Sequence, residues 1–202
     1  MDTGSTLDVM KRCTVRTAGA GNCGLHAVAQ TFNLNPVAQR AEGFTQLEAG
    51  DLRSALALAC GMAAYAARPP AAALWTRGNH RVTRSTGANV SAAATRPANW
   101  SSYPSFIAEN GEWLTGFDMA VIAGLEPLKK LRLIIFDPRL TKLALVLPLQ
   151  PGAKVPSTRP LEITDVEEAD IVIVLCPGLH WEATSHVDDD GNCIKRTRFG
   201  PR

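Results

Sequence analysis

Apolar residues recur at helical spacing after a glycine-rich turn near the start of the chain. Leu25, Val28, Ala29 and Phe32 stand at i, i+3, i+4 and i+7, which is the spacing of a helix with one buried face. Glycines before this pattern permit backbone angles that other residues avoid. The pattern therefore predicts a helix that begins at Cys23, directly after the turn.

Further apolar patterns predict both helices and strands. A second helix is expected to begin near Asp51, with its inner face at positions 52, 56, 59, 60 and 63. The β-branched run 169–176 predicts a fully buried strand, and the Pro177-Gly178 turn after it places His180 at the start of a last strand. Shorter helices are expected at 102–109 and 115–123, and strands at 131–136 and 143–147. Together these elements predict an α+β fold in which helices cover a mostly antiparallel central sheet.

Length and composition favour a single domain. The chain has 202 residues, of which 46% are hydrophobic, enough to bury a substantial core. We expect one domain over 1–202, with its core at about 15–187. Residues 68–100 lack an apolar period and predict a long insertion or mobile loop, which either selects substrates or is merely tolerated. Residues 195–202 predict a solvated basic tail.

Charge and cysteine usage narrow the class of protein. With 21 basic and 19 acidic residues, the chain has a net charge of +2, which does not indicate a nucleic-acid-binding protein. The longest apolar segment, 54–67, is shorter than the about 20 residues that a membrane span needs. The spacing of the five cysteines suggests neither a disulfide framework nor a zinc site, so we expect a reducing compartment, the cytoplasm, and no metal or cofactor.

Cys23 has the position of a reactive thiol. In the first turn of a helix, the helix dipole and the unpaired N–H groups favour thiolate, which predicts a pKa below the usual value of about 8.5. Backbone N–H groups at Gly21, Asn22 and Cys23 are suited to hold an oxyanion. The pattern is typical of a nucleophile, although free cysteines are also common as small buried hydrophobes.

A thiolate nucleophile needs a base, and His180 is the best candidate. It stands at a strand edge, and Glu182 lies two residues further on, so that both side chains share one face of an extended segment. A carboxylate there is placed to hold the imidazole in one tautomer, which completes a possible triad. The other histidines lack such a partner: they are His26, His80 and His186.

Four segments resemble, in sequence and order, the ovarian tumour (OTU) family of cysteine proteases. They are 21–27 (Gly-Asn-Cys-Gly-Leu-His-Ala), 110–114, the strand 133–136 and 178–181 (Gly-Leu-His-Trp). The resemblance covers about residues 15 to 185. It implies a papain-type fold and hydrolysis of the (iso)peptide bond after the C-terminal glycine of ubiquitin, polyubiquitin or a ubiquitin-like modifier. Cys23 would then be the nucleophile, His180 the base, and Glu182 would stand where the family usually has aspartate or asparagine.

The chain departs from the family at two positions. Ala20 stands where the family usually has aspartate, so backbone amides alone would serve the oxyanion. Gly24 replaces the usual leucine and is similar to the Cys-Gly-x-His pattern of arterivirus OTU-like proteases. This similarity indicates a viral or otherwise divergent origin, with the host cytoplasm as the location of a viral or effector protein. Two alternatives to a deubiquitinase stay open: a viral polyprotein-processing protease and a catalytically silent ubiquitin-binding module.

Three residues near these motifs are candidate substrate contacts. Gly24 follows the nucleophile and Trp181 follows the base, where it either packs on the cleft wall or shields the catalytic pair. Trp113 lies in the middle motif and fits a core aromatic better than a substrate contact.

A second cysteine, Cys193, matches the family's tetrapeptide more closely than Cys23 does. The segment after Cys193 is too short and too polar to form the buried helix that the mechanism needs. Asp190-Gly191, between 184–187 and 193–194, instead predicts a β-hairpin.

Overall fold

The structure is a computed structural model of the 202-residue chain. It describes residues 3–17, 22–43, 46–62, 103–109, 114, 116–150, 156–176 and 180–194. The expected insertion at 68–100, the basic tail at 195–202, and the candidate residues Gly21 and Trp113 lie outside these ranges.

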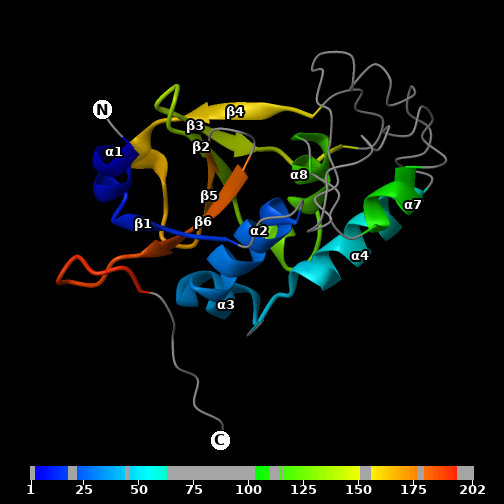
Figure 1. Ribbon diagram of the computed structural model, residues 1–202, viewed down its shortest axis with the longest axis horizontal. Helices are drawn as coiled ribbons and strands as arrows, with labels where there is room; N and C mark the ends of the chain where they lie inside the picture. The colour runs from blue at the N-terminus through cyan, green and yellow to red at the C-terminus, as the bar shows by residue number, and fades with distance from the viewer. Residues whose placement is uncertain are drawn as a thin grey trace, which may run out of the picture.

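A six-stranded sheet forms the centre of the fold, with strand order β1-β6-β5-β2-β3-β4 (Figure 1). β2 and β5 run parallel, and every other neighbouring pair is antiparallel. The prediction of a mostly antiparallel sheet in an α+β fold is therefore confirmed. The strands are β1 (Arg12–Val15), β2 (Leu133–Asp137), β3 (Lys142–Val146), β4 (Thr158–Leu161), β5 (Ile171–Cys176) and β6 (His180–His186).

The described helices include the two long ones that the apolar spacing predicts. They are α1 (Thr3–Val9), α2 (Cys23–Asn33), α3 (Pro36–Glu42), α4 (Ala49–Gly61), α7 (Tyr103–Ala108) and α8 (Gly116–Ile122), with 3-10 turns η2 (Leu128–Lys130) and η3 (Ile163–Asp165). Helix α3 was not predicted, because its seven residues bury only Ala38. A local cap begins it instead: Asn35 Oδ1 accepts from the amides of Val37 and Ala38, and Pro36 occupies the first turn.

Alternate residues of the central strands pack into two separate cores. Ile171, Ile173 and Trp181 point toward helices α2, α4, α7 and α8, where they join the larger cluster of buried residues. Val172 and Val174 point to the opposite face and pack with Leu7 of α1. This alternation follows from the two-residue period of a strand and explains why β5, residues 171–176, is apolar throughout.

Helix α2 runs along β6 and β5 from one end of the sheet to the other. In its last turn, Thr31 Oγ1 accepts from the amide of Thr184 at 3.0 Å. Beyond its last turn, Asn35 Nδ2 donates to the carbonyl of Glu168 at 2.7 Å, just before β5 begins. The start of α2 therefore lies where β5 ends and β6 begins.

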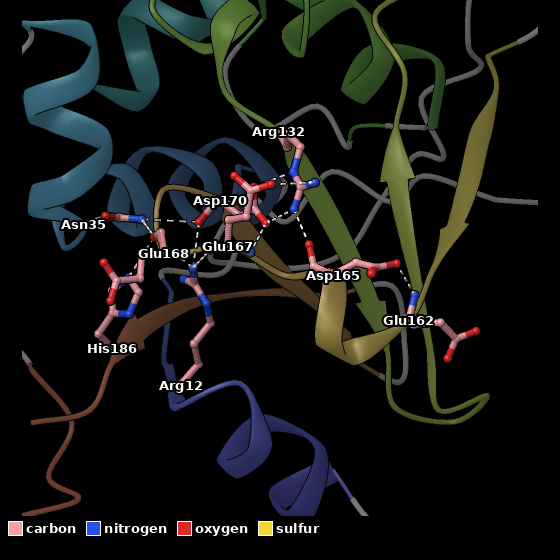
Figure 2. Close-up of polar contacts among 9 residues, drawn as sticks. All are labelled: Arg12, Asn35, Arg132, Glu162, Asp165, Glu167, Glu168, Asp170 and His186. Carbon is pink, nitrogen blue, oxygen red and sulfur yellow. Dashed lines mark hydrogen bonds and ion pairs between the residues drawn. The ribbon is translucent and has the colours of Figure 1, made fainter. Parts of the chain in front are cut away.

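Two arginines stabilise the end of the sheet that lies away from Cys23 (Figure 2). Arg12 is buried and donates to the carbonyls of Glu167, Glu168 and Asp170 at 2.9–3.3 Å. Arg132 Nε and Nη2 form a two-point ion pair with the Asp170 carboxylate at 2.8 and 2.6 Å. Burial lowers the pKa of Arg12 to about 10, with Asp170 and Glu168 opposing that shift. These contacts attach β1 and β2 to the segment before β5.

One cysteine prediction is wrong, because Cys13 and Cys193 form a disulfide with a Cα–Cα distance of 5.7 Å. The chain does reverse at Asp190-Gly191, so that Val187 and Cys193 form a β-bridge, but the type I′ turn that this dipeptide predicts is wrong, because of the two residues only Gly191 has a positive φ. β1 pairs with β6 alongside it. The spacing of the cysteines in the sequence does not reveal that Cys13 and Cys193 are close, because only the pairing of strands in the sheet brings them together. The cysteines therefore no longer support a reducing compartment. Among the described residues, Cys23, Cys60 and Cys176 are free thiols.

The helices that the structure describes are all too short or too polar to cross a membrane.

Candidate active site

Cys23 is the first residue of α2, and its thiol lies against the start of β6. The backbone amide of Trp181 hydrogen-bonds to the thiol, as do the amides of Cys23 itself and Gly24. The side chain is 3% exposed. The structure thus brings the sulfur beside the residue that follows His180, although the two segments are far apart in the sequence.

Burial raises the pKa of the Cys23 thiol, and the three backbone hydrogen bonds oppose the shift without reversing it. The lowered pKa that the helix N-terminus alone predicts for Cys23 is therefore wrong for this state of the protein. Desolvation disfavours the charged thiolate more than the amides stabilise it.

Gly24 allows the start of α2 to approach its neighbours closely. A Cβ at this position would lie 2.9 Å from Met119 Cε, 3.1 Å from Leu114 Cδ1 and 3.4 Å from Trp181 Cδ1. Gly24 and Trp181 are both buried. In the structure these two candidate substrate contacts pack against each other beneath the site.

Trp181 is fixed through both polar groups of its backbone. Its amide donates to Cys23, and its carbonyl accepts a hydrogen bond from Thr17 Oγ1. Thr17 is itself buried and lies just beyond β1. The peptide after His180 is therefore positioned by α2 on one side and by the β1 edge on the other.

His180 and Glu182 line a pocket of about 550 Å³ together with Arg16 and Thr17. His180 begins β6, and Glu182 lies two residues further along the same strand. Both residues are half-buried. The predicted base and its predicted orienting residue therefore share one pocket.

Cys176 is a member of this region that the sequence argument assigned to a buried strand alone. It pairs directly with His180 in the ladder between β5 and β6. Burial, the charge of Glu182 and a hydrogen bond with Glu182 raise the pKa of Cys176 to about 11, with a smaller contribution from Cys23. The signal was present in the sequence: Cys176 and His180 flank a Pro-Gly turn, and a tight turn places such residues opposite each other.

Asn22, the residue before Cys23, is held by an arginine of α4. Arg53 Nη2 donates to Asn22 Oδ1 at 2.5 Å, and Arg53 Nη1 donates to the Ile107 carbonyl at 2.7 Å. Arg53 is 5% exposed. A charged residue among the apolar positions of α4 was the sequence signal for this contact.

No family model and no curated sequence matches the chain. Among solved structures, an OTU deubiquitinase from Wolbachia pipientis wMel matches with a TM-score of 0.57 and 16% identity, over 92% of this chain and 93% of the other. An OTU deubiquitinase from the same bacterium, bound to ubiquitin, matches with a TM-score of 0.56 and 16% identity, over 87% of this chain and 96% of the other. The chain has an OTU-like fold.

Within this OTU-like fold, neither of the other two described histidines lines the pocket. His186 ends β6, and its Nε2 lies 3.1 Å from the Glu168 carbonyl in the far polar cluster (Figure 2). His26 is half-buried on α2. His80 lies outside the described residues. Over the described ranges, His, Cys, Asp and Glu side chains form no cluster of three that would hold a metal ion.

Proposed function

We propose that this chain is a cysteine-dependent deubiquitinase. It hydrolyses the (iso)peptide bond after the C-terminal glycine of ubiquitin, polyubiquitin or a ubiquitin-like modifier. The OTU-like fold supports this proposal, and so does a structural neighbour that binds ubiquitin. Fold alone does not determine activity, so the proposal depends on the chemistry of the site.

The observation that carries the proposal is the hydrogen bond from the Trp181 amide to the Cys23 thiol. It joins the start of the first buried helix to the start of the last strand, where His180 lies. A cysteine at a helix N-terminus beside a histidine-bearing strand is the arrangement that a thiol protease needs.

In the proposed reaction, the Cys23 thiolate attacks the carbonyl carbon of the modifier's last glycine. The new S–C bond gives a tetrahedral oxyanion, which collapses as the C–N bond breaks. His180, which took the thiol proton, gives it to the departing amine. Water then attacks the thioester with His180 as base, releasing the modifier and restoring the thiol. Glu182 is assigned to orient His180.

Backbone amides of residues 21–23 are assigned to the oxyanion. The amides of Cys23 and Gly24 already hydrogen-bond to the sulfur, so N–H groups of the first turn of α2 converge on the reacting atom. An oxyanion donor of this kind contributes about 3 to 4 kcal/mol to transition-state stabilisation.

A catalytically silent ubiquitin-binding module is the second candidate. Its supporting observation is the burial of Cys23, together with the raised pKa of its thiol. Under the deubiquitinase proposal, substrate binding must expose the sulfur and favour the thiolate. Under the silent alternative, ubiquitin binds and the sulfur stays buried.

The viral polyprotein protease and the cytoplasmic location stay predictions from the sequence, as do the substrate roles of Gly24, Trp113 and Trp181.

Steady-state hydrolysis of a ubiquitin C-terminal fluorogenic amide tests the proposal. Cys23→Ala and His180→Ala should abolish turnover. Two matched controls should keep it: Cys60→Ala removes a free thiol from the buried face of α4, and His186→Gln changes the histidine at the other end of β6. Ubiquitin binding without turnover by the wild-type protein would establish the silent module instead.

A further inference from the structure

Arg53 is a buried cation that contacts Asn22, the residue before the nucleophile. It extends from α4 and donates to the side chain of Asn22 and to the backbone of Ile107 in α7. Fixing a long side chain inside the protein costs conformational entropy, and burying its charge adds a desolvation cost. Such a contact is expected to have a consequence at the residue that it holds.

Asn22 occupies the N-cap position of α2, yet its side chain does not cap the helix. Asparagine is among the best N-cap residues, because its side-chain oxygen readily accepts from the N–H groups of the first turn. Asn35 shows that alternative: with an extended backbone at φ −112° and ψ 93°, it caps α3 by accepting from two amides, whereas Asn22 lies at φ −90° and ψ 1°. At Asn22 the equivalent oxygen accepts from Arg53 instead.

The direction of the Asn22 side chain determines what the first turn of α2 can bind. If Oδ1 capped α2 as Asn35 caps α3, it would accept from the amides two and three residues further on, and one of these, the Gly24 amide, otherwise points at the Cys23 sulfur. In the structure, the amides of Cys23 and Gly24 hydrogen-bond to the sulfur. Holding Oδ1 on Arg53 keeps that side of the turn open.

We propose that Arg53 is a positioning residue of the deubiquitinase reaction, which holds the Asn22 side chain away from the N-terminus of α2 so that the Gly24 amide serves the Cys23 thiolate. This inference rests on the proposed function. It adds a residue on a different helix, which acts through Asn22 and not by touching substrate.

Arg53→Met removes the donor and releases Asn22 to cap α2. We expect kcat to fall at least about tenfold with KM unchanged, because loss of the Gly24 amide disfavours the attacking thiolate and not the bound ubiquitin. Arg53→Lys keeps one ammonium group for the two acceptors, so its kcat should fall less than that of Arg53→Met. If Arg53→Met does not fold, Arg53→Lys still tests the inference.

Restoration of activity distinguishes positioning from simple structural support. In Arg53→Met/Asn22→Ala the competing oxygen is gone, so kcat should return to within about threefold of Asn22→Ala alone, as expected for coupled residues. A merely structural role predicts that the double variant is at least as impaired as Arg53→Met. Arg12→Met is the matched control, since it removes another buried arginine, at the far end of the sheet. It should lower stability and leave kcat unchanged.

A second readout does not require ubiquitin. The rate of iodoacetamide alkylation at Cys23 is measured against pH by peptide mass spectrometry. The pH at which this rate reaches half its maximum should be higher in Arg53→Met than in the wild-type protein. In the double variant it should return to the wild-type value. Wild-type protein that cleaves no ubiquitin substrate would refute the proposed function while this shift still supports the role of Arg53. The inference would be overturned if both Arg53 variants had the kcat and the alkylation profile of the wild-type protein. It would also be overturned if adding Asn22→Ala to Arg53→Met did not restore kcat and the alkylation profile.

Discussion

The backbone amide of Trp181 hydrogen-bonds to the thiol of Cys23. This contact joins the N-terminus of α2 to the first residues of β6, and the carbonyl of the same tryptophan is held by Thr17. Because His180 immediately precedes Trp181, any movement of this peptide changes the position of the candidate base relative to the candidate nucleophile. The site therefore depends on the register of β1, β6 and α2 as much as on the reacting side chains.

Replacing Glu182 with glutamine should slow turnover of a ubiquitin substrate at least about tenfold, because an amide cannot stabilise the imidazolium that forms on His180. KM should change little, since the contact acts on the base and not on the bound ubiquitin. Steady-state kinetics over pH 6 to 9 measure this. A loss smaller than tenfold would refute the assignment of Glu182 as the orienting residue.

The pH dependence of Cys176 alkylation should depend on the carboxylate of Glu182. Its thiol has a pKa of about 11, raised by burial and then by Glu182, so the reaction rate should still be rising at pH 10. Glu182→Gln removes the negative charge and should shift the profile to lower pH. Peptide mass spectrometry after timed iodoacetamide pulses gives the rate at each cysteine. Identical Cys176 profiles in the two proteins would show that Glu182 does not act on this thiol.

Reducing the Cys13–Cys193 disulfide should lower the free energy of unfolding by about 2 to 4 kcal/mol, because the bond restrains a very long loop in the unfolded chain. Urea titrations with and without dithiothreitol measure the difference. Cys13→Ser/Cys193→Ser should behave like the reduced protein and be insensitive to dithiothreitol. Equal midpoints for oxidised and reduced wild-type protein would contradict the role of this bond.

His186 should make the fold less stable in mild acid. Burial and then Arg12 lower the pKa of His186 below 6.5, with the Glu168 carbonyl and the Glu168 charge opposing. The unfolded chain therefore binds a proton more readily than the folded one, so this stability is present above pH 6.5 and is lost as pH falls below it. His186→Gln should lose less stability than wild type between pH 7.5 and 5.5 in urea titrations. Parallel losses would contradict this prediction.

The main helices and strands could be predicted because each has a strong local pattern. The face formed by Leu52, Leu56, Ala59 and Cys60 is buried as the spacing requires, and the apolar strand 171–176 has neighbours on both faces. Helices α1 and α3 were missed because short helices carry too few apolar positions to define a period.

The properties of the site were harder to predict, since they depend on contacts between distant segments. The position of Cys23 beside the start of β6 was expected from the family resemblance, but the direction of its pKa shift was not, because burial is a tertiary property. The Arg53–Asn22 contact and the Cys13–Cys193 bond likewise join segments that no local pattern relates.

The most direct test of the account is reaction with a ubiquitin probe that carries an electrophile at its C-terminus, followed by peptide mass spectrometry. The account predicts one covalent adduct, located on Cys23, which is lost in Cys23→Ala and much slower in His180→Ala. Folded protein that binds ubiquitin but forms no adduct, or that forms it on Cys176 or Cys60, would contradict the assignment of Cys23 as the nucleophile.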